Sequence, residues 1–201
     1  FKQSRSSRDN PYRDYYHWWP AEKGKPNHRW SFFDENSDAW KYDAQTNAYY
    51  LHYFSQKQPD LNWENPKVRQ EVYNIMKFWA DKGVDGFRLD AFQFVSKDIE
   101  FPPFPEGYDD NIPSVIKYHG MGPHIHHYLR EMYNEVLSKY DVFAVSEGAG
   151  STLDDAHSIV DEDRNELQMV YHFEGTDLVS SLDKCTLKDF KASFTKWETS
   201  F

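Results

Sequence analysis

The sequence is poor in three features that mark common classes of protein. It has a single cysteine, Cys185, which excludes a disulfide framework within the chain and a thiolate metal site. No apolar run approaches the roughly 20 residues of a membrane-spanning helix. Acidic residues outnumber basic ones by 33 to 23, for a formal net charge of −10, and no polybasic run is present. We therefore expect no membrane and no nucleic-acid partner, and a substrate that is neutral or cationic.

Aromatic residues, in contrast, are abundant, with 7 Trp, 14 Tyr and 15 Phe. Many of them lie in polar surroundings, for example within residues 12–20 and 47–54. Aromatic faces exposed in loops or clefts suit stacking on flat apolar ligands, including sugar rings. The alternative is ordinary packing inside a loop-rich subdomain.

The chain divides into two parts that differ in composition and in the pattern of apolar residues. Residues 1–57 are polar, aromatic and interrupted by proline and glycine, so we expect an irregular domain with a few short strands, for example around 48–54. Residues 58–201 instead alternate helical and strand patterns. Because this alternation favours a parallel sheet, the second part is expected to be an α/β domain.

Local signals place the elements of the second part. Asn65 and Pro66 are typical of a helix start, and Gly83 of a helix end. The apolar positions expected on one face of this helix are Val68, Val72, Ile75 and Trp79. The further expected elements are a strand with Phe87, Leu89 and Asp90, a helix with Ile125, Leu129, Met132 and Val136 on one face, strands at 141–148 and 167–173, and helices at 151–160 and after Thr186.

Two of the three expected strands of this part end in a carboxylate, Asp90 and Glu147. In a parallel barrel the carboxyl ends of the strands surround the active-site mouth, so both acids would face one pocket. Two carboxylates across a pocket are the minimal apparatus for glycoside hydrolysis. One is a nucleophile that stays ionised, and the other is an acid whose pKa is raised.

Arg88 lies two residues before Asp90, on the same side of the strand, and its charge would lower the pKa of Asp90. Glu147 has no basic neighbour in the sequence, so its pKa is expected to rise on burial. The alternative is a buried pair of Arg88 and Asp90 that only specifies the fold. The run HIHH, residues 124–127, could indicate a metal site, although a solvated or capped helix start explains it better.

Four stretches resemble the α-amylase family of glycoside hydrolases, glycoside hydrolase family 13. GVDGFRLDAF, residues 83–92, resembles the fourth-strand motif with the nucleophile, and VSEG, residues 145–148, resembles the fifth-strand segment with the general acid. QPDLNWENPKV, residues 58–68, is similar to the stretch that closes the loop domain inserted after the third strand. YYLHYFSQKQPDLN and FWADKGVDGFR resemble the branch with oligo-1,6-glucosidases, α-glucosidases, dextran glucosidases and sucrose isomerases.

The resemblance implies a retaining double displacement in a (β/α)8 TIM barrel. Asp90 would be the nucleophile and Glu147 the general acid and base, while Arg88, Ala91 and Phe92 would bind the substrate. Residues 1–57 would form the inserted loop domain, and residues 58–201 a partial barrel of about strands 4 to 6 with flanking helices. The third carboxylate that the family requires would lie outside this chain, so the chain is expected to be a fragment that is inactive alone.

The resemblance also bears on the substrate. In this branch a Val after the nucleophile accompanies α-1,6 preference, and Ala or Thr accompanies α-1,4, because a β-branched side chain narrows the site. Ala91 therefore favours an exo-acting α-glucosidase that releases glucose from maltose or α-1,4-linked malto-oligosaccharides. The alternatives are an oligo-1,6-glucosidase, a sucrose isomerase, or a catalytically silent amylase-like domain that binds a partner. Sucrose isomerases carry an Arg-rich loop where FEGTDL, residues 173–178, stands here, which favours hydrolysis.

The remaining expectations concern cofactors and surroundings. No cofactor is expected to be required. Calcium occurs in parts of the family, but no acidic cluster here has the spacing of a calcium loop, so no ligands are assigned. The expected partner is an α-glucoside oligosaccharide. The cellular location stays open, with the cytoplasm favoured over the periplasm or secretion.

Overall fold

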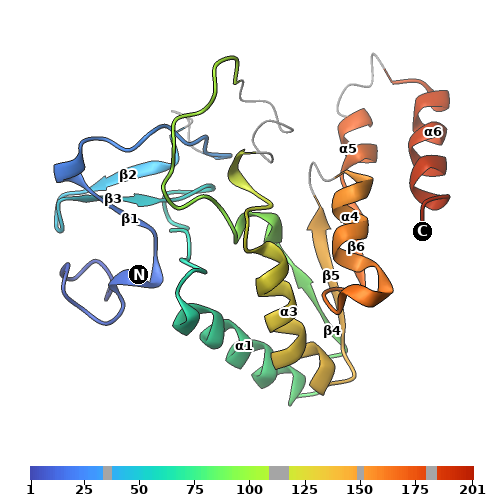
Figure 1. Ribbon diagram of the computed structural model, residues 1–201, viewed down its shortest axis with the longest axis horizontal. Coiled ribbons are helices and arrows are strands. Elements are labelled where there is room, and N and C mark those ends of the chain that lie inside the picture. Colours follow the sequence, from blue (N-terminus) through green and yellow to red (C-terminus); the bar gives the residue numbers. More distant parts are fainter. Residues whose placement is uncertain (34–37, 109–117, 149–151, 180–184) are drawn as a thin grey trace. The chain divides into compact units, whose positions relative to one another are not determined.

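The computed structural model describes residues 1–33, 38–108, 118–148, 152–179 and 185–201 (Figure 1). Its contacts divide the chain into two compact units. The first consists of residues 1–75 and 95–123, and the second of residues 76–94 and 124–201. The predicted boundary after residue 57 does not coincide with this division. The predicted boundary marks the end of an inserted domain, and a division into compact units does not test for an inserted domain. The boundary therefore stays a prediction.

The first unit contains a small antiparallel sheet. Its strands are β1 (Trp18–Pro20), β2 (Trp40–Asp43) and β3 (Ala48–Leu51), in the order β1-β3-β2. Two short 3-10 helices, η1 (Arg13–Tyr15) and η2 (Ala21–Lys23), accompany the sheet. The strand expected around residues 48–54 is thus confirmed as β3.

Helix α1 (Pro66–Ala80) begins where the sequence predicts it. The Asn65 side chain accepts a hydrogen bond from the Lys67 amide at 3.0 Å, as an N-terminal cap does. The predicted apolar face is only partly right, because Ile75 and Trp79 are 59% and 49% exposed. The buried residues of this helix are Val68, Arg69, Tyr73 and Met76. Apolar residues cover more than one side of α1, so their spacing alone could not select the side that is buried.

The second unit is an α/β structure with a parallel sheet of three strands in the order β4-β5-β6, as predicted. Its strands are β4 (Gly86–Leu89), β5 (Phe143–Gly148) and β6 (Met169–His172). Its α-helices are α3 (Ile125–Glu135), α4 (Leu153–Val160), α5 (Glu174–Val179) and α6 (Leu187–Glu198), and its 3-10 helices are η3 (Phe92–Phe94), η4 (Leu137–Lys139) and η5 (Glu162–Arg164). The predicted buried face of α3 is confirmed, since Ile125, Leu129, Met132 and Val136 are all buried.

The register of the sheet places chosen side chains on one face. Arg88 pairs with Val145, and Glu147 pairs with Tyr171. Because successive side chains alternate between faces, Arg88, Glu147 and Tyr171 share a face. On the opposite face of β5, Ala144 and Ser146 are buried. The sheet therefore has a packed face and a more open face, and the open one carries Arg88, Glu147 and Tyr171.

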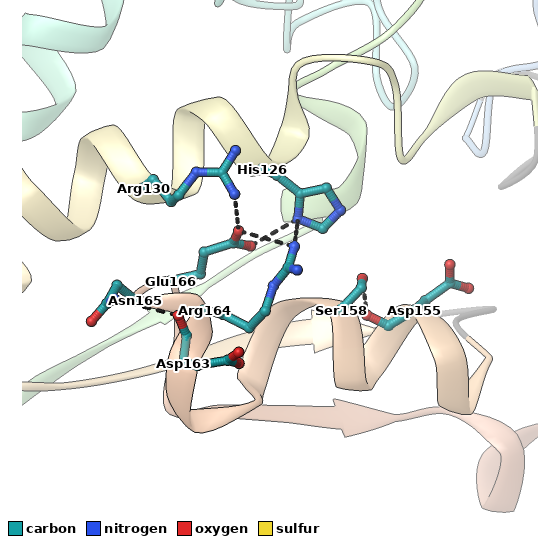
Figure 2. A network of polar contacts seen from close by, with 8 residues as sticks. All are labelled: His126, Arg130, Asp155, Ser158, Asp163, Arg164, Asn165 and Glu166. Carbon is teal, nitrogen blue, oxygen red and sulfur yellow. Dashed lines mark hydrogen bonds and ion pairs between the residues drawn. The ribbon is translucent and has the colours of Figure 1, made fainter.

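The segment just before β6 carries a buried carboxylate, Glu166, which contacts residues of α3 (Figure 2). Glu166, which is 2% exposed, accepts hydrogen bonds from His126 Nδ1 at 2.9 Å and from Arg130 Nη1 at 3.2 Å, both on α3. Arg164 approaches the same carboxylate at 3.5 Å. These contacts tie α3 to the segment that leads into β6. None of the helices in the described parts of the chain has the length and apolar character needed to cross a membrane.

Candidate active site

Arg88 brings the two predicted carboxylates together at the ends of β4 and β5. Asp90 directly follows β4, and Glu147 is the penultimate residue of β5. Arg88 forms an ion pair through Nη1 with Asp90, and its Nη2 lies 2.9 Å from Glu147 Oε1. Since all three residues belong to the second unit, the cluster is formed within one compact body.

The cluster is open to solvent to different degrees. The side chains of Asp90 and Arg88 are 76% and 44% exposed, whereas that of Glu147 is only 16% exposed. The alternative of a buried Arg88–Asp90 pair that merely specifies the fold is not tested by this exposure, because the chain is expected to be a fragment, and it stays a prediction. Within this chain, these charges lie on the face of the sheet that is open to solvent.

The surroundings shift the pKa values of the two carboxylates in opposite directions. The pKa of Asp90 is lowered, first by its hydrogen bond with Glu147 and then by Arg88. The pKa of Glu147 is raised, chiefly by burial, although the amide of Ala91 opposes this rise. The predicted directions are both found, but the hydrogen bond with Glu147 lowers the pKa of Asp90 more than Arg88 does, and burial opposes both. As the pH rises, Asp90 therefore ionises before Glu147, which is the division that a nucleophile and an acid need.

The residues after Asp90 form a tight turn. Ala91 adopts φ 46°, in the left-handed region, and its amide donates to Glu147 Oε2 at 2.9 Å. Phe92 opens η3 and is only 5% exposed. Ala91 thus supports the carboxylate cluster through its backbone. The substrate contacts predicted for Ala91 and Phe92 stay predictions.

Tyr171 belongs to the cluster although the sequence did not single it out. Its hydroxyl accepts a hydrogen bond from Arg88 Nε at 2.7 Å, across 83 positions of the chain. The only signal in the sequence was its place in the third expected strand. That signal could not reveal the register that sets Tyr171 beside Glu147.

The candidate metal site at residues 124–127 finds no support in the described structure. His124 occupies the N-cap position of α3, and His126 hydrogen-bonds to the buried Glu166. Among the residues that are placed, no group of three or more His, Cys, Asp or Glu side chains could hold a metal ion. Calcium elsewhere in the intact protein stays an open expectation.

The full sequence, residues 1–201, matches the family model described as alpha amylase, catalytic domain. The chain belongs to the α-amylase family. This membership confirms the resemblance carried by residues 83–92 and 145–148. It also agrees with the parallel β4-β5-β6 sheet, which is the part of a barrel that the chain was expected to form.

Similar proteins in this family include glucosidases and an isomaltulose synthase. The oligo-1,6-glucosidase of Parageobacillus thermoglucosidasius is 48% identical over 204 residues, covering 98% of this chain and 36% of that protein. The α-glucosidase of Schizosaccharomyces pombe is 43% identical over 219 residues, covering 99% and 36%. The crystal structure of the isomaltulose synthase SmuA from Protaminobacter rubrum matches with a TM-score of 0.87 at 40% identity, covering 98% and 36%. The chain thus spans about 36% of the length of these relatives.

Proposed function

We propose that the intact protein is a retaining α-glucosidase in which Asp90 is the nucleophile and Glu147 the general acid and base. The observation that carries this proposal is the opposite pKa shift of two carboxylates bridged by one arginine. An ionised Asp90 is ready to attack, and a carboxyl at Glu147 that keeps its proton longer is ready to donate it.

The proposed reaction has two displacements at the anomeric carbon. In the first, Asp90 forms a bond to that carbon while Glu147 donates its proton to the departing glycosidic oxygen. In the second, Glu147 takes a proton from water, the water oxygen attacks the same carbon, and the ester bond to Asp90 breaks. Each displacement inverts the carbon, so the released glucose keeps the α configuration.

For the linkage, we propose α-1,6-linked isomalto-oligosaccharides as the main substrates. The support is the similarity to several oligo-1,6-glucosidases, among them those at 48% and 47% identity. This replaces the α-1,4 preference expected from Ala91 as the first choice. Cleavage of maltose and malto-oligosaccharides is the second candidate, supported by the similarity to α-glucosidases. Isomerisation is disfavoured because residues 173–178 contain no arginine.

The deciding experiment compares hydrolysis of isomaltose and maltose by the intact protein, with the anomer of the released glucose followed by NMR. We expect a higher kcat/KM for isomaltose and α-glucose as the first product. Asp90→Asn and Glu147→Gln should each lower turnover by several orders of magnitude. Asp154→Asn, on the exposed surface of α4, is the matched control and should keep the wild-type rate. A folded intact protein that turns over neither sugar would favour the silent, partner-binding alternative.

We propose further that the 201-residue chain alone has no activity. Its described residues contain a parallel sheet of three strands, whereas a closed barrel surrounds its site with eight. An assay of the isolated chain with p-nitrophenyl α-glucoside checks this. Clear turnover that Asp90→Asn abolishes would show that the chain contains a sufficient active site.

A further inference from the structure

The guanidinium of Arg88 meets a different partner at each of its three nitrogens. Nη1 pairs with Asp90, Nη2 lies 2.9 Å from Glu147, and Nε donates to the Tyr171 hydroxyl at 2.7 Å. A distance of 2.7 Å is at the short end for a charge-assisted N–H···O bond. Tyr171 is therefore a strong anchor for a cation whose other polar partners, among the residues that the structure describes, are the two carboxylates.

The fold holds the Tyr171 side chain in place. Residue 171 is the register partner of Glu147 in the β5–β6 ladder, so the backbone hydrogen bonds of the sheet fix its position relative to that carboxylate. Its ring stacks with the ring of Phe173, with centroids 5.8 Å apart. The Arg88 guanidinium carbon also lies 5.7 Å from the centroid of the Tyr171 ring. The Tyr171 hydroxyl thus belongs to a side chain whose position is fixed by the β5–β6 ladder and by the ring of Phe173.

Arg88 needs such an anchor because it is a long side chain that is 44% exposed. An exposed arginine has many rotamers, and confining it costs conformational entropy. A fixed third contact limits the rotation of the planar guanidinium, so that one nitrogen faces each carboxylate.

We propose that Tyr171 is a positioning residue that holds the Arg88 guanidinium between Asp90 and Glu147, a role that rests on the proposed catalytic functions of these two acids. Tyr171 acts through Arg88 and not on the substrate. Loss of its hydroxyl lets the guanidinium move away from both carboxylates for part of the time. Both acids then experience less positive charge, so both become easier to protonate.

The test is Tyr171→Phe in the intact protein, which removes the hydroxyl and keeps the ring. We expect kcat/KM to fall about tenfold, as for the loss of one hydrogen bond to a charged group, with the change in kcat and not in KM. Both limbs of the pH profile of kcat/KM should move to higher pH. Limbs that coincide with those of the wild type, or that move to lower pH, overturn the proposal.

The matched control is Tyr140→Phe. The Tyr140 hydroxyl donates to Asp81 Oδ1 at 2.9 Å, so this substitution also removes a tyrosine hydrogen bond to a charged group, but outside the carboxylate cluster. It should leave kcat and the pH profile unchanged. Equal effects of the two substitutions would show a general loss of stability, and circular dichroism and Tm measurements on both variants establish that each is folded.

A double-mutant cycle tests whether Tyr171 works through Arg88. Lysine has no counterpart of the Nε donor, so in an Arg88→Lys background Tyr171→Phe should cause no further loss of kcat with p-nitrophenyl α-glucoside. If the losses of kcat caused by Arg88→Lys and Tyr171→Phe add in the double variant, the proposal is overturned. The outcome is separable from the proposed function itself. If Asp90→Asn and Glu147→Gln keep full activity, the catalytic assignment fails. If these two variants lose activity but Tyr171→Phe changes neither kcat nor the pH profile, the positioning role alone fails.

Discussion

The backbone amide of Ala91 donates a hydrogen bond to the carboxylate of Glu147, with N and Oε2 2.9 Å apart. This bond joins the turn after β4 to the end of β5, and Ala91 makes it from the left-handed conformation, at φ 46°. An L-residue with a side chain is strained in this region by about 1 to 2 kcal/mol. The site therefore stores some backbone strain next to the proposed nucleophile.

Ala91→Val should add to that strain, because a β-branched side chain fits poorly at positive φ. We expect Tm of the intact protein to fall, together with the rates on both maltose and isomaltose. Ala91→Gly is the control, since glycine adopts this conformation without strain and should keep the hydrogen bond to Glu147. The ratio of the two rates in the Val variant reports separately on linkage preference. A Val variant with wild-type Tm and rates would show that the left-handed turn is not required.

Gly86→Ala should disrupt the sheet that carries the site. A Cβ at position 86 would collide with the backbone carbonyl oxygen of Phe143, and backbone atoms in a ladder cannot move aside cheaply. We expect a marked loss of Tm and of activity together.

Gly175→Ala provides the comparison for that substitution. A Cβ there would meet a Phe194 ring carbon at 3.7 Å, an ordinary van der Waals contact. Because alanine also favours helix more than glycine, Gly175→Ala in α5 should be neutral or slightly stabilising. If Gly86→Ala and Gly175→Ala lower Tm and activity equally, the close approach of β4 and β5 is not the reason that position 86 requires glycine.

Glu166→Gln should destabilise the protein, because it leaves His126, Arg130 and Arg164 around a group without charge (Figure 2). Removing one partner of a buried ion pair costs about 3 to 5 kcal/mol, and the exposure of Arg130 lowers our expectation to about 2 to 3 kcal/mol. Urea unfolding of the intact protein measures this change. Glu162→Gln, at an exposed position in the neighbouring η5, should change the free energy of unfolding little.

The sequence was sufficient to predict the parts of this structure that local signals specify. Asn65 and Pro66 marked the start of α1, and the alternation of strands and helices indicated the parallel order β4-β5-β6. Asp90 and Glu147 were recognisable because each carboxylate closes an apolar strand. These signals act over a few residues, so they survive without knowledge of the fold.

Features that depend on register and on the choice of a packing face could not be predicted in the same way. Tyr171 becomes a partner of Arg88 only because β6 pairs with β5 in one particular register. Ile75 and Trp79 were expected to be buried, but the interior takes Tyr73 and Met76.

Asp90→Asn and Glu147→Gln should change stability in opposite directions at neutral pH. The pKa of Glu147 is raised in the folded protein, so its ionised form is the unfavourable one, and the stability that it contributes at low pH is lost as the pH rises through its folded pKa. Glutamine resembles the neutral form. Glu147→Gln should therefore raise Tm at pH values above 4.5, which is the ordinary pKa of a glutamate side chain. The pKa of Asp90 is lowered, so its ionised form stabilises the fold above the ordinary value of 3.8, and Asp90→Asn should lower Tm there. Thermal unfolding of the wild type and both variants over a pH series checks this. The two differences in Tm should have opposite signs at neutral pH and shrink together in acid, and equal signs would contradict the opposing pKa shifts on which the catalytic assignment rests.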